Sequence, residues 1–386
     1  MKTSPIVCVA QPSWDGPYAK STVLLMKELA HNHKVLYVDY ASTWKDCLGL
    51  LLQRKWSVVR RMLGLSSRIR MMSQVFVLTL PPVIPQNFLP QGMLRHILTR
   101  INNWTIRKAI RKAMVKLRFD RPIVINAFSP ELGIDLLGNL NEAATVYYCY
   151  DEISQADWRA RHSALPERVF ASKTDAVIVT SDALLEAKSK LNKNTFVVKN
   201  GVDVNVFKSD KTYHQSSNVV GFVGSLDSRI DYKLLEEVIS ANRDLKFRFI
   251  GQIVDQTFEK LRSFSNVRWH APVPYAELPH HIAQFDIGII PFVKSAFTEK
   301  IYPLKINEYL AMGKPVVMTS FAKLPEFESL VSTADNPRSF SEALHSGIAG
   351  DSPLQQKRRI DLAHRNSWRA RAREFETIIQ TVSHGH

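Results

Sequence analysis

The sequence is 386 residues long, 45% of them apolar, and it carries a formal net charge of +15. This length predicts about two domains of roughly 150 residues each, and the composition excludes a disordered or collagen-like chain. No run reaches the roughly 18 apolar residues of a membrane-spanning helix, and the short, polar start of the chain is unlike a signal peptide. The cysteines, Cys8, Cys47 and Cys149, share no metal-binding or redox spacing, which is typical of reduced core thiols in a cytosolic protein.

The first 200 residues alternate between short apolar runs rich in β-branched residues and amphipathic segments. A helix is predicted over 21–32, and strands are predicted over 6–10, 34–40, 122–128, 144–152 and 175–181. Continuous apolar strands that alternate with helices predict a parallel sheet covered on both faces. Ligands of such sheets lie beyond the carboxyl ends of the strands.

A basic block interrupts this alternation, because residues 47–119 contain 14 Lys and Arg and no Asp or Glu. Apolar and basic side chains fall on opposite faces of a predicted helix over 106–118, and 54–65 mixes Arg with Trp, Leu and Met. The run before 106 has an apolar stripe of different phase, so Asn102-Asn103 is predicted to separate two helices. Basic amphipathic helices with Trp favour an anionic membrane surface. The alternatives are that the stripes face the protein's own core, or that the block binds nucleic acid, for which no module signature is present.

The second half repeats the alternation after a turn at Asn200-Gly201 and a polar run over 209–218. Strands are predicted over 219–225, 246–252, 266–274, 286–292 and 315–320, and helices over 231–243, 275–285, 303–313 and 367–380. The pattern predicts an α/β protein with two doubly wound, Rossmann-like parallel-sheet domains that face a cleft. We place them at 1–200 and 201–366, with a C-terminal helix in 367–386.

Two clusters in the second half are suited to a nucleotide without a metal. The chain has no P-loop, no GxGxxG and no pair of aspartates two residues apart. Gly224 and Ser225 follow a strand, where backbone N–H groups can meet a phosphate that Arg229 also reaches; the alternative is an ordinary turn. Lys305 and Glu308 share a helix face, which suits a diphosphate and ribose hydroxyls, or else an exposed ion pair.

The order of these motifs resembles a known family. The segments NGVD, VGFVGSLDSRIDYKLL, NVRWHAPVPYAELPHHIAQFDIGIIPF and PLKINEYLAMGKPVV are similar to the C-terminal domain of GT-B glycosyltransferases, in particular the family 4-like (group 1) enzymes of bacterial cell-surface polysaccharide synthesis. The resemblance covers about 145–375. It implies sugar transfer from a nucleotide-diphosphate sugar without a bound metal, and a final helix that crosses back to the first domain.

The resemblance also implies roles for individual residues. Glu308 would hold the ribose, and four residues would surround the diphosphate: Gly224, Ser225, Arg229 and Lys305. The base would lie near His270 to Val273. Retaining members carry a second Glu eight residues before the ribose Glu, where this chain has Lys300 beside Glu299. A retaining or inverting outcome therefore stays open, and Lys300 is a candidate phosphate contact.

On the acceptor side, the candidate catalytic residues are Asp151 and Glu152, at the polar end of the predicted strand over 144–152. An inverting enzyme needs a carboxylate there to take the acceptor proton. The alternative for Asp151 is a helix N-cap. Asp15, next to Gly16 in the first loop, is a further catalytic candidate, or else this pair shapes the acceptor pocket.

Together these observations predict a cytoplasmic glycosyltransferase on the inner face of the plasma membrane. Residues 1–200 would bind a lipid-linked or saccharide acceptor and anionic lipid, and 201–366 the sugar donor. The alternatives are a nucleotide-sugar epimerase of the same fold and a non-catalytic GT-B binding protein. No motif specifies the sugar, the base, the acceptor or the oligomeric state.

Overall fold

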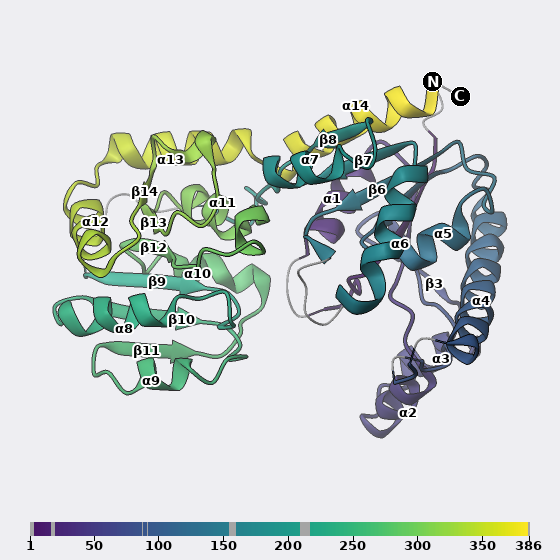
Figure 1. The fold of residues 1–386 in the computed structure, drawn as a ribbon, viewed down its shortest axis with the longest axis horizontal. Coiled ribbons are helices and arrows are strands. Elements are labelled where there is room, and N and C mark those ends of the chain that lie inside the picture. The colour runs from purple at the N-terminus through teal and green to yellow at the C-terminus, as the bar shows by residue number, and fades with distance from the viewer. Residues whose placement is uncertain are drawn as a thin grey trace. The chain divides into compact units, whose positions relative to one another are not determined.

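The computed structural model describes residues 4–16, 20–86, 88–90, 92–153, 160–208 and 217–384. Most of the predicted polar run at 209–218 and the last two residues lie outside this part of the chain. The chain divides into two compact units, which are residues 1–198 with 372–386, and residues 199–371 (Figure 1).

Unit 1 is built on an eight-stranded sheet in the order β3-β4-β2-β1-β5-β6-β7-β8. Its strands are β1 (Ile6–Ala10), β2 (Val35–Val38), β3 (Ile69–Met72), β4 (Val75–Leu78), β5 (Ile123–Ala127), β6 (Ala144–Cys149), β7 (Ala176–Val179) and β8 (Thr195–Val197). All neighbours pair in parallel except β3 with β4. That antiparallel edge hairpin is absent from the expectation, because it lies inside the basic block and has little hydrophobic alternation.

The helices of unit 1 are α1 (Ser21–Leu29), α2 (Trp44–Leu52), α3 (Trp56–Met62), α4 (Met93–Leu117), α5 (Pro130–Leu136), α6 (Ala160–Lys173) and α7 (Asp182–Lys188). The expected break at Asn102-Asn103 is wrong, because α4 runs through it. The Asn102 side chain is buried and makes two 2.9 Å hydrogen bonds with the backbone of Ile84, one to the N–H and one to the carbonyl. It therefore clamps the helix to a neighbouring segment and does not end it.

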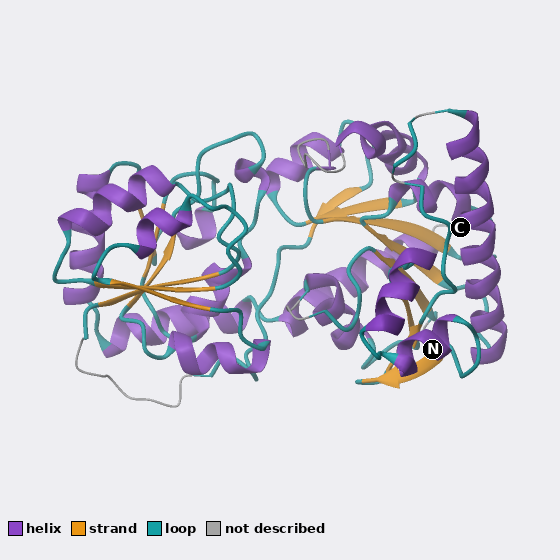
Figure 2. Ribbon diagram, turned by 90° about the horizontal axis from the view of Figure 1, so that it is seen from below, coloured by secondary structure: helices purple, strands orange, loops and turns teal. Residues whose placement is uncertain are grey.

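Unit 2 contains a fully parallel six-stranded sheet in the order β11-β10-β9-β12-β13-β14. Its strands are β9 (Val219–Val223), β10 (Lys246–Ile250), β11 (Val267–His270), β12 (Ile287–Ile290), β13 (Val316–Met318) and β14 (Val331–Thr333). Its helices are α8 (Tyr232–Ala241), α9 (Phe258–Arg262), α10 (Leu278–Ile282), α11 (Leu304–Ala311), α12 (Pro337–Ala349) and α13 (Pro353–Arg365), with short 3₁₀ turns η2 (Tyr275–Glu277), η3 (Thr298–Lys300) and η4 (Pro325–Phe327). Helices cover both faces of this sheet (Figure 2).

The last helix, α14 (Trp368–His384), begins in unit 2 and belongs to unit 1 from Ala372 onward. Phe375 packs edge-on against Tyr148 of β6, with 5.6 Å between ring centroids. Glu376 accepts hydrogen bonds from the Asn32 amide at 3.0 Å and pairs with the His33 ring at 3.0 Å. These contacts attach the end of the chain to the sheet of unit 1. The expected class, two doubly wound parallel-sheet domains, is confirmed.

Candidate functional site

The centre of the unit 2 sheet is its topological switch point. β9 and β12 are neighbours, while the strands that follow each of them lie on opposite sides. The loops after these two strands are tied together, because the N–H of Asp231 donates to the carbonyl of Pro291 at 2.8 Å and that of Val293 donates to the carbonyl of Arg229 at 2.7 Å. Ligands of doubly wound sheets bind at such a point, beyond the carboxyl ends of the strands.

Two glycines shape the edge of this site. Gly224 directly follows β9 and has a φ of +155°, and Gly251 directly follows β10 and has a φ of +153°. A Cβ at Gly251 would stand 1.8 Å from the carbonyl oxygen of Gly224, so the two backbones approach as closely as glycine permits. Ser225, the residue after Gly224, is half-buried. The glycine turn expected from the sequence is therefore a close backbone contact between two strand ends.

Arg229 lies in the same loop and is oriented by Asp227. Its guanidinium donates two hydrogen bonds to that carboxylate, from Nε at 2.9 Å and from Nη2 at 2.7 Å. The guanidinium carbon also lies 5.3 Å from the centre of the Phe292 ring, over its face. A planar cation held in this way has a fixed direction, which suits recognition of a phosphate.

The helix α11 carries the lysine–glutamate pair. Lys305 Nζ lies 2.7 Å from Glu308 Oε2, and the Glu308 side chain is only 4% exposed against 26% for Lys305. The Tyr309 hydroxyl accepts a 2.8 Å hydrogen bond from the N–H of Val223, which anchors α11 to the end of β9. The Glu308 carboxylate is therefore largely buried, and Lys305 holds it beside the switch point. The exposed surface pair that spacing alone allowed is not what the structure contains.

Tyr275 is a neighbour of Glu308 that sequence reasoning missed. Burial, together with the charges of Glu308 and Asp203, raises the pKa of Tyr275 far above its ordinary value, so the phenol stays neutral. Its ring packs edge-on against Phe207 at 5.3 Å. No local motif marks a tyrosine of this kind, because its meaning depends on a carboxylate more than thirty residues away.

The remaining predicted residues of unit 2 lie on loops at the carboxyl ends of its strands. His270 ends β11, where its carbonyl accepts from the N–H of Gly251 at 3.1 Å, and its ring lies 5.1 Å from that of His281. Burial first, then His270, His280 and Arg248, lower the pKa of His281. Val273 is half-buried against the core. Lys300 is half-buried at the end of η3, in the loop after β12.

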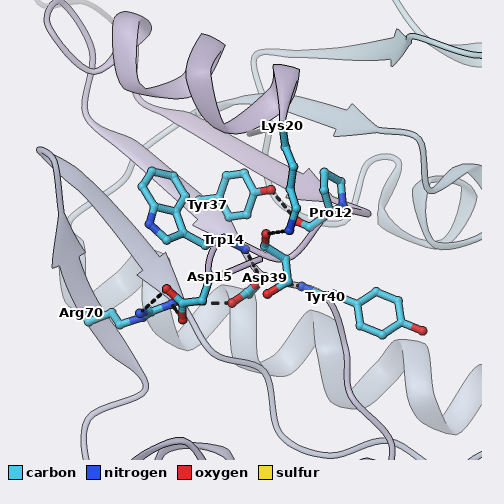
Figure 3. A network of polar contacts seen from close by, with 9 residues as sticks. Pro12, Trp14, Asp15, Lys20, Tyr37, Asp39, Tyr40 and Arg70 are labelled. Carbon is cyan, nitrogen blue, oxygen red and sulfur yellow. Dashed lines mark hydrogen bonds and ion pairs between the residues drawn. The ribbon is translucent and has the colours of Figure 1, made fainter. Parts of the chain in front are cut away.

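In unit 1, Asp15 is part of a polar network at the carboxyl ends of β1 and β2 (Figure 3). The Arg70 guanidinium binds Asp15 with contacts of 2.9 and 2.5 Å and lies 3.8 Å from Asp39. Gly16 follows, and a Cβ there would meet only the flexible end of the Lys20 side chain and, at 3.7 Å, a backbone oxygen. The negative charge of Asp15 is thus compensated by the Arg70 guanidinium.

Asp39, at the end of β2, is a member of this network that the sequence reading did not single out. Its Oδ1 accepts hydrogen bonds from the N–H groups of Trp14 at 2.9 Å and Tyr40 at 3.0 Å. Burial is the main cause that raises the pKa of Asp39, against the lowering effect of these bonds. An acid at the carboxyl end of a predicted strand was the available signal, the same one that pointed to Asp151.

Asp151 and Glu152 have different surroundings. Asp151 is half-buried after β6, and its carbonyl accepts from the Cys149 thiol at 3.3 Å. Glu152 is buried and pairs with Lys188 at 3.0 Å, and Lys188 also pairs with Glu167 at 2.9 Å. The Glu152 carboxylate is therefore part of an internal ion network, which leaves Asp151 as the more accessible of the two.

The basic block forms a surface with many exposed apolar side chains. Sixteen of the nineteen exposed large apolar residues in the described part of the chain lie between Tyr40 and Val115. The exposed large apolar residues of α2, α3 and the first half of α4 are named here the α2–α4 surface. They are Trp44, Leu48, Leu52, Trp56, Met93, Leu94, Ile97, Ile101 and Trp104. The second half of α4 behaves as the alternative reading expected, with Ile106, Ile110 and Met114 buried in the core.

Two general properties follow from the described residues. None of their helices combines the length and apolarity needed to cross a bilayer. Among the same residues, no group of three or more His, Cys, Asp or Glu side chains is arranged to hold a metal ion.

Comparison with known proteins identifies related sequences and folds. Residues 217–349 match the family model "Glycosyl transferases group 1". The chain is 28% identical over 273 residues to "Putative teichuronic acid biosynthesis glycosyltransferase TuaH" of Bacillus subtilis (strain 168), which covers 63% of this chain and 68% of that protein.

Solved structures share the fold across the whole chain. Sucrose-phosphate synthase from Thermosynechococcus elongatus matches with a TM-score of 0.73 and 13% identity, and it covers 100% of both chains. Anabaena HepE in complex with UDP matches with a TM-score of 0.63 and 13% identity, and it covers 98% of this chain and 100% of its own. At these identities the likeness establishes the fold, which is GT-B.

Proposed function

We propose that this chain, which matches the group 1 glycosyltransferases over residues 217–349 and has the GT-B fold, moves a sugar from a nucleotide-diphosphate sugar to a lipid-linked saccharide acceptor in bacterial cell-surface polysaccharide synthesis. The observation that carries the proposal is the buried Glu308 carboxylate, held by Lys305 at the switch point of unit 2. The relative TuaH, named for teichuronic acid biosynthesis, supports the product class.

The donor site is assembled from α11 and the two tied loops. Glu308 accepts hydrogen bonds from the ribose hydroxyls, which charge makes stronger than neutral ones. Lys305, Arg229 and Lys300 supply positive charge for the diphosphate, and the backbone at Gly224 and Ser225 lets it approach. α11 adds an N-terminus with no side-chain cap, where anions are favoured. The base lies beside His270 and Val273. HepE, which shares the fold, is described in complex with UDP.

In this scheme Lys305, Arg229 and Lys300 stabilise the departing diphosphate without a metal, and Glu308 and Asp227 share and orient the first two of these cations. On the acceptor side, Asp151 is the first candidate for the group that takes the acceptor proton. Asp39 is a second candidate, and Asp15 contributes to the same polar rim through Arg70. We assign Glu152 to the support of the loop that carries Asp151.

The nucleotide part of the proposal is tested by thermal unfolding with UDP, GDP and ADP in the presence of a chelator. A ligand that binds the native state stabilises it and so raises the unfolding midpoint. When the free ligand concentration is a hundred times Kd, the free energy of unfolding rises by about 2.7 kcal/mol. We expect a shift with one diphosphate, and release of that diphosphate from its sugar only when a saccharide-lipid acceptor is added. Release without an acceptor and with an epimerised sugar would indicate an epimerase; binding without any release would indicate a binding protein.

We also propose that the α2–α4 surface docks on anionic lipid, which places the enzyme peripherally on the inner face of the plasma membrane. Leu52 is 86% exposed and Trp104 is 53% exposed, and such side chains gain free energy by entering the headgroup region. The region around them is acid-free from 47 to 119, so its field attracts anionic headgroups. An acceptor anchored in the same bilayer would then be concentrated near the enzyme.

The double variant Leu48→Ser/Leu52→Ser is expected to weaken binding to phosphatidylglycerol vesicles at least tenfold. Two leucines that become partly buried in the bilayer contribute roughly 2 kcal/mol or more to the binding free energy. Vesicle flotation measures this. The matched control, Leu165→Ser/Leu354→Ser, removes two leucines that are 70% and 60% exposed elsewhere and should bind like the wild type. Equal binding of the wild type to phosphatidylcholine and phosphatidylglycerol vesicles, or no binding to either, would contradict the docking proposal.

A further inference from the structure

The chain passes between the two units twice, after Val198 and after Arg371. On the unit 2 side the two passages lie against each other. The N–H of Val202 donates to the carbonyl of Asn366 at 3.0 Å, and the N–H of Trp368 donates to the carbonyl of Val202 at 3.0 Å. A Cβ at Gly201 would stand 2.8 Å from the backbone nitrogen of Trp368, so this contact is as close as glycine permits.

Three buried asparagines join these passages to the helix of the donor site. Asn307 precedes Glu308 on α11 and is fully buried, and Asn200 and Asn366 are each 6% exposed. The Asn307 amide donates to the Asn200 carbonyl at 3.2 Å and to the Tyr302 hydroxyl at 3.3 Å. Its Oδ1 accepts from the Asn366 amide at 2.9 Å. We call Asn200, Asn307 and Asn366 the asparagine joint.

The joint is closed by two further bonds. The Asn200 amide donates to the Tyr302 carbonyl at 3.0 Å, and the Asn366 Oδ1 accepts from the Arg371 guanidinium. Apolar residues of similar volume would fill this space without the cost of burying amides. A buried polar network keeps most of its groups paired in one arrangement only, so it specifies the register of the elements that it joins; in the described part of the chain, one group of this network, the Oδ1 of Asn200, has no partner. A loss of register at one member therefore leaves the others without partners.

We infer that Asn307 and Asn366 are positioning residues for sugar transfer, which couple the setting of α11 to both passages between the units. The inference rests on the proposed donor site, because α11 carries Lys305 and Glu308. Both asparagine side chains are buried, and their hydrogen bonds go to other protein groups. A movement of α11 on donor binding is transmitted through Asn307 to Asn200 at one passage and through Asn366 to the other. The substrate class that acts on the joint is thus a nucleoside diphosphate bound at α11.

The first experiment separates positioning from stability. Asn307→Leu and Asn366→Leu each leave a buried polar partner unpaired, and each should lower the unfolding midpoint by roughly 2–6 °C. The double variant removes both ends of the bond between the two asparagines but also the bonds to Asn200 and Arg371, so its midpoint should fall by less than the sum of the two single losses. We expect its kcat to stay about tenfold below the wild type while the KM for the sugar donor changes less than about threefold. A kcat that recovers in the double variant, or that never falls, would overturn the inference.

The second experiment uses the wild-type protein and does not depend on how the variants fold. Amide hydrogen exchange is measured with and without UDP, or with GDP or ADP if one of these gives the larger thermal shift. The inference requires slower exchange at 199–203 and 366–371 as well as at 224–229 when the diphosphate is bound. Protection confined to 224–229 and α11 would overturn it. No protection at any of these segments would instead count against the proposed donor site itself.

Discussion

Replacing Glu308 by alanine is expected to weaken binding of the nucleoside diphosphate by about 10- to 100-fold, because hydrogen bonds to a charged group contribute about 1.5–3 kcal/mol. The Glu308 side chain is 4% exposed and is oriented by Lys305 at 2.7 Å, so its oxygens have a fixed direction before the ribose arrives. Preorganised contacts of this kind lose little entropy on binding. Titration calorimetry on the purified variant measures the change directly.

The fold should survive this substitution, since Lys305 is 26% exposed and water can solvate its ammonium group once the carboxylate is gone. Glu342→Ala is the matched control. That side chain also pairs with a cation on a helix of unit 2, Arg338 at 3.0 Å, but it is 63% exposed and far less ordered by its surroundings. Unchanged diphosphate affinity in Glu308→Ala, with the control also unchanged, would remove Glu308 from the ribose role.

Replacing Lys188 by methionine is expected to destabilise unit 1 by about 3–5 kcal/mol, because removing one partner of a buried ion network leaves its counterions uncompensated. Glu152 and Glu167 are both buried and both pair with this lysine, at 3.0 and 2.9 Å. Tyr147 donates to Glu167 at 2.9 Å but carries no charge that could replace the lysine. Urea unfolding of the full chain measures the loss.

The pH dependence of this network has a definite sign. Burial opposes the charged form of Lys188, but Cys149, Glu167 and Glu152 around it raise its pKa above the ordinary value overall. A raised lysine pKa contributes stability that is fully present below the unfolded-state pKa and is lost only as the pH rises through the folded-state value. The wild-type contribution is therefore constant across neutral pH.

Lys190→Met provides the control for this prediction. Lys190 lies two residues away, is 72% exposed and pairs only loosely with Glu186 at 3.9 Å. Its removal should change stability by no more than about 0.5 kcal/mol. If Lys188→Met unfolded at the same urea concentration as Lys190→Met, the buried network would not stabilise unit 1, and Glu152 would return to consideration as a catalytic group.

Much of the fold was predictable from local pattern. Runs such as 6–10 and 176–179 are continuously apolar and rich in β-branched residues, which is typical of parallel strands buried on both faces. The edge hairpin β3–β4 was not predictable in the same way, since a strand such as Ile69–Met72 is half exposed and gains its order from its neighbour. The predicted helix break at Asn102 was wrong for a related reason. The two hydrogen bonds that hold Asn102 inside the helix go to Ile84, which is 18 residues away in the sequence.

The candidate site divides along the same line. The sequence by itself determined the glycine turn at Gly224, the shared face of Lys305 and Glu308, and the carboxylates at the ends of strands, because each depends on residues within a few positions of one another. Only the tertiary structure decided that Glu308 is buried, that Glu152 pairs with Lys188, and that Asp39 joins Asp15 around Arg70. Burial and ion pairing depend on which distant segments the sheet brings together, and neither periodicity nor spacing contains that information.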